Sequence, residues 1–83
     1  TSVDGRIVNN EGEGIPDAFI LLYDIDINTN EFIYSDENGY FNIYFEHNGD
    51  LDVLVISDDY KNQQFTLTTS SEVYDLNEII MEN

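Results

Sequence analysis

Ser35-Asp36-Glu37-Asn38-Gly39-Tyr40-Phe41-Asn42-Ile43-Tyr44-Phe45 is the stretch on which the fold prediction depends. Asp36 to Gly39 has the composition of a tight turn, because Asp and Asn side chains bond to nearby backbone and glycine tolerates a positive φ. After the turn, apolar and polar residues alternate as in a strand with one buried face. The inward side carries Phe41, Ile43 and Phe45, and the outward side carries Tyr40, Asn42 and Tyr44. The stretch predicts a hairpin turn that leads into a central, aromatic-rich strand.

Six further segments of the chain have strand length and composition, with turn residues between them. They are Val3–Val8, Ala18–Tyr23, Glu31–Ser35, Leu51–Ser57, Gln63–Thr68 and Val73–Met81. An Asn-Gly pair at Asn48-Gly49 is a strong hairpin signal before the fifth strand. No segment has a helical period with caps. The pattern predicts an all-β, seven-stranded Greek-key β-sandwich. The expected core is Ala18, Ile20, Leu22, Phe41, Ile43, Phe45, Leu51, Val53, Val55, Phe65 and Leu67.

The composition is that of one small domain with a strongly acidic surface. The chain has 83 residues, of which 41% are hydrophobic and 13% aromatic, so it can form a core. It has no Cys, which excludes disulfides and thiolate metal sites, and no apolar run long enough for a membrane span. Eighteen acidic residues against two basic ones give a formal net charge of −16. This charge argues against binding to nucleic acid or to anionic membranes. It favours the binding of cations or basic partners, or else it serves only to keep the protein soluble.

Four motifs in the right order resemble a known family. They are Val3-Asp4-Gly5-Arg6-Ile7-Val8, Gly14-Ile15-Pro16-Asp17-Ala18-Phe19-Ile20, the stretch Ser35–Phe41, and Gly49-Asp50-Leu51-Asp52-Val53-Leu54-Val55. Together they resemble the carboxypeptidase regulatory-like domain, a transthyretin-like (prealbumin-like) β-sandwich related to Cna-B-type surface-protein repeats. One departure is Asp59-Tyr60, where the family usually has Gly-Tyr; Asp tolerates the positive φ that this turn requires.

The resemblance implies a non-catalytic structural or protein-interaction module of a larger extracellular or cell-surface protein. Residues 1–83 would be a single domain excised from that protein, and its partners would be neighbouring domains or another protein. Isopeptide crosslinks of related surface domains need a lysine in the first strand, where this chain has Arg6. The alternative is a carbohydrate- or ligand-binding accessory domain that uses exposed tyrosines. We expect neither nucleic-acid binding nor membrane insertion.

Candidate sites for chemistry are few. The only histidine, His47, lies in a predicted turn, so we expect no catalytic residues, no enzyme and no required cofactor. Asp24, Asp26 and Asn28 place oxygen side chains at alternate positions, as in the first half of an EF-hand loop. The EF-hand glycine and helices are missing. We therefore weigh a calcium site at these residues against a solvated hairpin.

A second candidate is an interaction surface. If Phe41 and Val53 point inward, then Tyr40, Tyr44, Leu54 and Ile56 point outward. Should their strands share one sheet, its outer face would carry tyrosine and aliphatic side chains, which is unusual for a solvated surface. Such a patch would dock another domain or support a weak homodimer, unless loops or the last strand cover it.

Overall fold

Seven strands make up the fold in a computed structural model, which describes residues 2–24, 26, 28–45, 49–69 and 73–83. The strands are β1 (Ser2–Val8), β2 (Phe19–Asp24), β3 (Thr29–Tyr34), β4 (Tyr40–Tyr44), β5 (Gly49–Ile56), β6 (Gln63–Thr69) and β7 (Val73–Ile80). The described residues form no helix, and so this part of the chain contains no helix that could span a membrane. The seven predicted strands are confirmed, with ends shifted by one or two residues. His47 and Asn48 lie outside the described residues.

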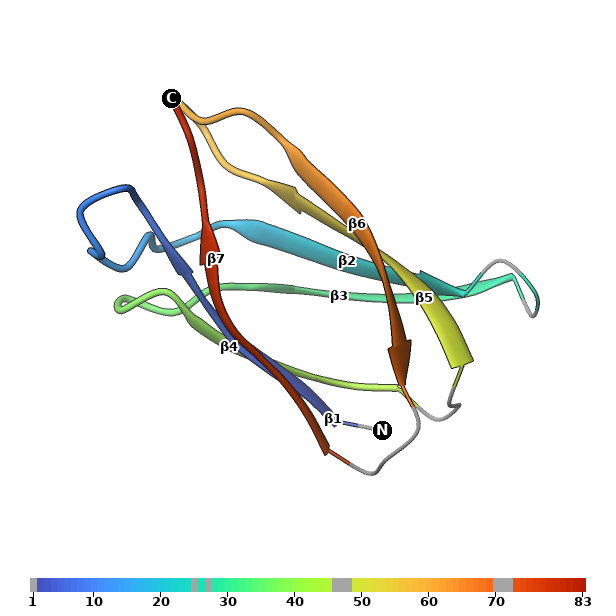
Figure 1. The fold of residues 1–83 in the computed structure, drawn as a ribbon. Helices are drawn as coiled ribbons and strands as arrows, with labels where there is room; N and C mark the ends of the chain where they lie inside the picture. Colours follow the sequence, from blue (N-terminus) through green and yellow to red (C-terminus); the bar gives the residue numbers. More distant parts are fainter. Residues whose placement is uncertain (1, 25, 27, 46–48, 70–72) are drawn as a thin grey trace.

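The strands form two sheets that pack face to face as a β-sandwich (Figure 1). One sheet has the order β4-β1-β7, in which β1 and β7 run parallel. The other has the order β3-β2-β5-β6 and is antiparallel throughout. The predicted all-β sandwich is thus confirmed, while its description as a Greek key stays a prediction. Because β1 and β7 are parallel, β1 begins near one end of the molecule and β7 ends near the other (Figure 1).

The core lies between the sheets and consists of the inward side chains of every strand. Ten of the predicted core residues are buried, and Phe65 is only partly buried against them. The structure adds six buried side chains that the prediction did not include: Val3, Ile7, Val8, Ile15, Ile79 and Met81. Gly5 is also part of this packing, because a Cβ there would lie 2.6 Å from a ring atom of Phe41. The bare glycine makes room for that ring.

Two predicted hairpins are not formed. β4 lies in the three-stranded sheet, whereas β3 and β5 both lie in the four-stranded sheet, so β4 pairs with neither. β4 is also an edge strand and not a central one. The turn at Asp36 to Gly39 does exist, since the Gly39 amide donates to the Asp36 carbonyl at 3.0 Å and Gly39 has a φ of +87°. It carries the chain from one sheet to the other instead of returning it within a sheet.

The contact between the turn and β1 explains why the chain crosses between sheets. The Ile7 amide donates to the Gly39 carbonyl at 2.7 Å, which ties the turn to β1. On the other side, the buried Ser35 hydroxyl accepts from the Ala18 amide at 2.9 Å and donates to the Ile15 carbonyl at 2.6 Å. The residues on either side of the crossing are therefore anchored to different sheets.

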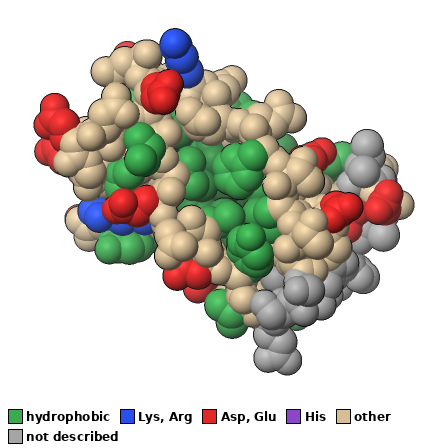
Figure 2. Space-filling view, in the orientation of Figure 1, with side chains coloured by type: hydrophobic (Ala, Val, Ile, Leu, Met, Phe, Trp, Pro, Cys, Tyr) green, Lys and Arg blue, Asp and Glu red, His purple; other side chains and the backbone are tan. Residues whose placement is uncertain are grey.

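The edges of the sandwich differ. β3 and β4 contact each other across one edge, whereas the opposite edge, between β6 and β7, is more open. Figure 2 views the molecule from this side, with hydrophobic side chains gathered between the two strands and acidic side chains around them. Phe65, Tyr74 and Leu76 from these strands pack against the core but are only partly buried.

Candidate functional site

The predicted interaction surface is divided between the two faces of the molecule. Tyr40 and Tyr44 are exposed on the β4-β1-β7 sheet, with exposed fractions of 54% and 65%. Leu54 and Ile56 belong to β5 on the other sheet, where Leu54 is half-buried and Ile56 is 39% exposed. The assumption that β4 and β5 share a sheet is wrong, so these four residues do not form one patch.

A larger apolar surface lies on the outer face of the β3-β2-β5-β6 sheet. Strand pairing sets Phe19 opposite Tyr34 and Ile56, and Leu21 opposite Phe32 and Leu54. We call these side chains the aromatic patch: Phe19, Leu21, Phe32, Tyr34, Leu54 and Ile56. Alternation along each strand makes them point away from the core, because their neighbours in sequence fill it.

The rings of the aromatic patch contact one another but stay open to solvent. The Phe19 ring centroid is 5.6 Å from the centroids of both Phe32 and Tyr34, and the latter two rings meet edge to face at 6.3 Å. Phe32 is 57% exposed and Tyr34 is 56% exposed. Exposed aromatic side chains that adjoin one another are typical of binding surfaces. The sequence did carry a signal for them, since inward Ala18, Ile20 and Leu22 require Phe19 and Leu21 to point outward.

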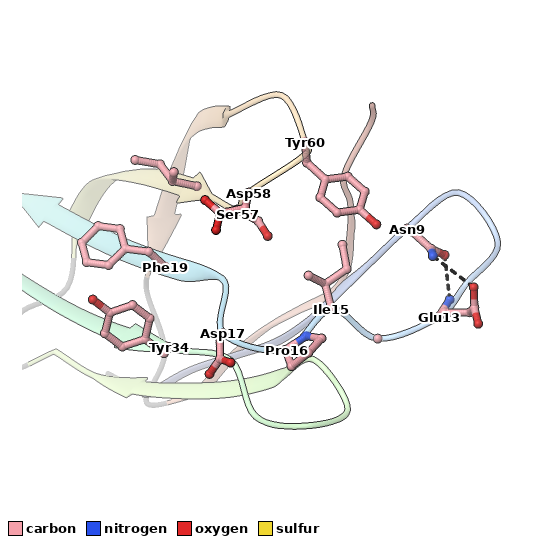
Figure 3. A pocket seen from close by; sticks show the side chains of 12 residues that line it. Asn9, Glu13, Ile15, Pro16, Asp17, Phe19, Tyr34, Ser57, Asp58 and Tyr60 are labelled. Carbon is pink, nitrogen blue, oxygen red and sulfur yellow. Dashed lines mark hydrogen bonds between the residues drawn. The ribbon is translucent and has the colours of Figure 1, made fainter.

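The aromatic patch continues into a groove of about 700 Å³ at the end of the sheet where β2 begins and β5 ends. Its lining residues are Asn9, Glu13, Gly14, Ile15, Pro16, Asp17, Phe19, Tyr34, Ile56, Ser57, Asp58 and Tyr60. Figure 3 shows Phe19 and Tyr34 at one end of the groove, Asn9 and Glu13 at the other, and Asp17 and Asp58 between. The groove therefore combines apolar walls with carboxylates.

On the β4-β1-β7 sheet, the Arg6 side chain lies over one face of the Tyr40 ring. The Arg6 guanidinium carbon lies 4.9 Å from the centroid of the Tyr40 ring, which is a cation–π geometry. The same side chain donates to the Asn38 carbonyl at 2.9 Å and forms an ion pair with Glu78 at 3.7 Å. One face of Tyr40 is thus already covered from within the molecule, which leaves Tyr44 as the more available tyrosine on this sheet.

The three residues of the predicted calcium site take different positions. Asp24 ends β2 as an inward, buried residue, and its carboxylate accepts the Asp26 amide at 2.9 Å. Asp26 lies in the turn, and Asn28 accepts the Tyr23 hydroxyl at 2.7 Å. Tyr23 and Asp24 are adjacent in β2 and point to opposite sides of the sheet. One carboxylate oxygen of Asp24 and the side-chain oxygen of Asn28 are thus each used in a local hydrogen bond, and calcium binding here stays a prediction.

Within the described ranges, no group of three His, Asp or Glu side chains is close enough to hold a metal ion. No buried side-chain nitrogen or oxygen in the same ranges is left without a hydrogen-bond partner. The strongest local feature of the described surface is therefore the aromatic patch with its groove.

Comparisons with known proteins agree with this architecture. No family model and no curated protein matches the sequence. Among solved structures, a chain of the type II Cohesin-X-Dockerin complex from Acetivibrio cellulolyticus superposes with a TM-score of 0.71 and 19% identity. The 3-chlorocatechol 1,2-dioxygenase from Rhodococcus opacus 1CP gives a TM-score of 0.64 and 13% identity.

These matches show the fold alone. They cover 98% and 99% of this chain but 56% of each matched chain, so this chain spans little more than half of their length. An enzyme and a chain of a protein complex share the architecture, so the architecture does not assign an activity. Together with the two sheets, the matches fit a β-sandwich of the immunoglobulin-like or prealbumin type.

Proposed function

We propose that this chain is a non-catalytic protein-interaction module that docks a partner through the aromatic patch. The observation that carries the proposal is the exposure of Phe32 and Tyr34, each more than half open to solvent beside Phe19. Leaving such rings in water forgoes the roughly 1.5–3 kcal/mol that burial of each large apolar side chain supplies. A partner that covers them recovers part of this free energy.

The resemblance to the carboxypeptidase regulatory-like domain supports the same function. The first motif forms β1, and the second leads into β2. The third forms the turn before β4, and the fourth lies in β5, so the motifs supply strands to both sheets. Asp59 has a φ of +69°, so it holds the conformation of the glycine that it replaces in the family pattern. One matched chain comes from a complex of proteins, which is in keeping with an interaction role.

The proposal includes a place in a larger extracellular or cell-surface protein. The molecule measures 34 Å along its longest axis, and β1 begins near one end while β7 ends near the other (Figure 1). This arrangement suits a spacer within a row of domains, whose neighbours on the same polypeptide are candidate partners for the patch.

A carbohydrate- or ligand-binding role is the second candidate, and the exposed rings favour it. Sugars stack best on aromatic rings whose faces are open to solvent and lie in one plane. The Phe32 and Tyr34 rings stand at 85° to each other, the Phe19 and Tyr34 rings at 60°, and the Phe19 and Phe32 rings at 32°, so the three rings do not share one plane. Tyr40 is covered by Arg6 on one side. The protein partner therefore ranks first.

Two double variants test the proposal on the folded chain. Phe32→Ser with Tyr34→Ser removes the most exposed rings of the aromatic patch, and Tyr40→Ser with Tyr44→Ser removes two comparable rings from the other sheet. Adjacent domains of the parent protein, and partners found by crosslinking, are titrated against both variants by calorimetry. We expect the patch variant to lose binding by about tenfold or more, as for central aromatic anchors, and the other variant to keep it. A partner that binds both variants equally well contradicts the proposal, and glycan binding lost with Tyr44 supports the second candidate.

A further inference from the structure

The chemistry of the groove indicates what kind of partner the aromatic patch accepts. Register sets Phe19 at the start of β2 opposite Ile56 at the end of β5. Asp17 lies two residues before Phe19, and Asp58 lies two residues after Ile56. Because β2 and β5 are antiparallel, both aspartates lie at the same end of the sheet. Glu13 lies farther along the groove (Figure 3).

Among the described residues, no ion pair is formed by Glu13, Asp17 or Asp58. No Lys, Arg or His is among the residues that line the groove in the described part of the chain. The ion pair found among the described residues joins Arg6 to Glu78 on the opposite sheet. Glu13 does accept the Asn9 side-chain amide at 3.2 Å, but that neutral contact leaves the negative charge in place.

The walls of the groove suit the carbon stem of a long basic side chain. Phe19, Tyr34 and Ile56 supply apolar contact, and the ring faces attract a cation. The molecule contains an example of such a contact in Arg6, which combines a ring face at 4.9 Å with a carboxylate at 3.7 Å.

We propose that the groove receives a lysine or arginine side chain of a partner polypeptide, whose adjacent apolar side chains cover Phe32 and Leu54. This inference rests on the proposed docking function and names the chemistry of the partner. Asp17 and Asp58 pair with the cation, while Phe19 and Tyr34 contact its stem and its charged end. The combination selects a basic, apolar segment and disfavours an acidic one.

A second copy of this chain does not meet that requirement. Each copy carries 18 acidic and two basic residues, so two copies of the same face would bring carboxylates together. Of the two basic side chains, Arg6 is already engaged with Tyr40 and Glu78 on the opposite sheet, so a second copy has only the exposed Lys61 to offer to a groove lined by three carboxylates. A partner with surplus positive charge is therefore required.

The test uses the isotope-labelled chain and two peptides, followed by NMR chemical-shift mapping. The probe is acetyl-Leu-Arg-Leu-Arg-Leu-amide, and the control replaces both arginines with citrulline, which has the same shape without the charge. We expect shifts centred on the residues that line the groove and at least about tenfold weaker binding of the citrulline peptide, since pairing with interfacial carboxylates contributes on this scale. Equal affinity for both peptides, shifts centred on the β4-β1-β7 sheet, or no binding at millimolar peptide overturns the inference.

Two further double variants separate the groove from general charge attraction. Asp17→Asn with Asp58→Asn removes the groove carboxylates, and Asn suits the φ of +59° at position 17. Asp50→Asn with Asp52→Asn makes the same charge change on β5, where Asn can still accept from Thr68 and Thr66. We expect about tenfold weaker arginine-peptide binding for the groove variant and less than about twofold for the control. Equal losses overturn the inference.

The same variants keep the two proposals apart. If Phe32→Ser with Tyr34→Ser abolishes partner binding and the groove variant does not, the docking function holds and the basic-segment inference fails. If instead the partner binds the Phe32→Ser, Tyr34→Ser variant with full affinity, the docking function itself fails.

Discussion

Replacement of Gly39 by alanine should strongly destabilise the fold, because the added methyl group would meet the backbone of β1. Gly39 has a φ of +87°, and an added Cβ would lie 2.2 Å from the Ile7 carbonyl oxygen and 2.9 Å from the Ile15 amide nitrogen. Both contacts are backbone atoms, and the Ile15 amide donates to that Ile7 carbonyl at 2.8 Å. The methyl group therefore cannot be accommodated by turning a side chain away.

The expected loss follows from two separate costs. A left-handed backbone costs an L-residue roughly 1–2 kcal/mol relative to glycine. The added methyl group would also force the turn away from β1. Overpacking of this kind costs about 1–3 kcal/mol, a figure that includes the weakened hydrogen bond between the turn and β1. The sum of about 2–5 kcal/mol is large for a domain of this length, whose total stability is on the order of 4–12 kcal/mol.

Gly12→Ala is the matched control. Gly12 has a similar φ of +82°, but nothing lies within 4 Å of the position that its Cβ would take. Only the backbone cost of about 1–2 kcal/mol then applies. Urea unfolding followed by far-UV circular dichroism and tyrosine fluorescence gives the free energy of unfolding of both variants. If Gly39→Ala loses no more than about 1 kcal/mol beyond Gly12→Ala, the close approach of the turn to β1 is wrong.

Three other predictions can be checked with the same unfolding assays. Ser35→Ala should cost about 1–3 kcal/mol, because it leaves the Ala18 amide and the Ile15 carbonyl without their buried partner; an unchanged urea midpoint would contradict this. The net charge of −16 should make Tm rise with added salt, equally for sodium and potassium at matched ionic strength. A calcium site at Asp24, Asp26 and Asn28 would add a calcium-specific increase at fixed ionic strength, about 2.7 kcal/mol at a hundredfold excess over Kd. Identical melts in calcium and magnesium, unmoved by Asp26→Asn, would show that the site does not exist.

The sequence predicts the strands well because each strand carries its own signal. Alternation in Phe41 to Phe45 and in Leu51 to Val55 fixes which side chains face the core, and all of these inward residues are buried. The turn at Asp36 to Gly39 is equally local, since the Asp36 carboxylate accepts the amides of Asn38 and Tyr40 at 2.9 Å. Such features depend on residues close together in the chain, so no knowledge of the rest of the fold is needed.

Sheet membership is not local, and the prediction of a single patch shared by β4 and β5 was wrong for that reason. Alternation predicts that Tyr44 and Leu54 both point outward, but it carries no information on which strands share a sheet. In the structure, β4 and β5 lie in different sheets. The turn sequences before β4 and β5 are compatible with hairpins and with crossings between sheets. For the turn before β4, the crossing is held by long-range hydrogen bonds from Ile7 to Gly39 and from Ser35 to Ile15 and Ala18.

The aromatic patch and its groove depend on the same long-range pairing. Phe19 meets Phe32 and Tyr34 through the β2–β3 pair, and it meets Ile56 through the β2–β5 pair. The antiparallel β2–β5 pair also brings Asp17 and Asp58 to the same end of the sheet, where both line the groove, although each lies in a loop that is unremarkable by itself. A mutation that shifts the β2–β5 register by one residue would turn Phe19 inward and separate the two carboxylates. The patch and the charge of the groove are therefore expected to be lost together, because one strand pair positions both.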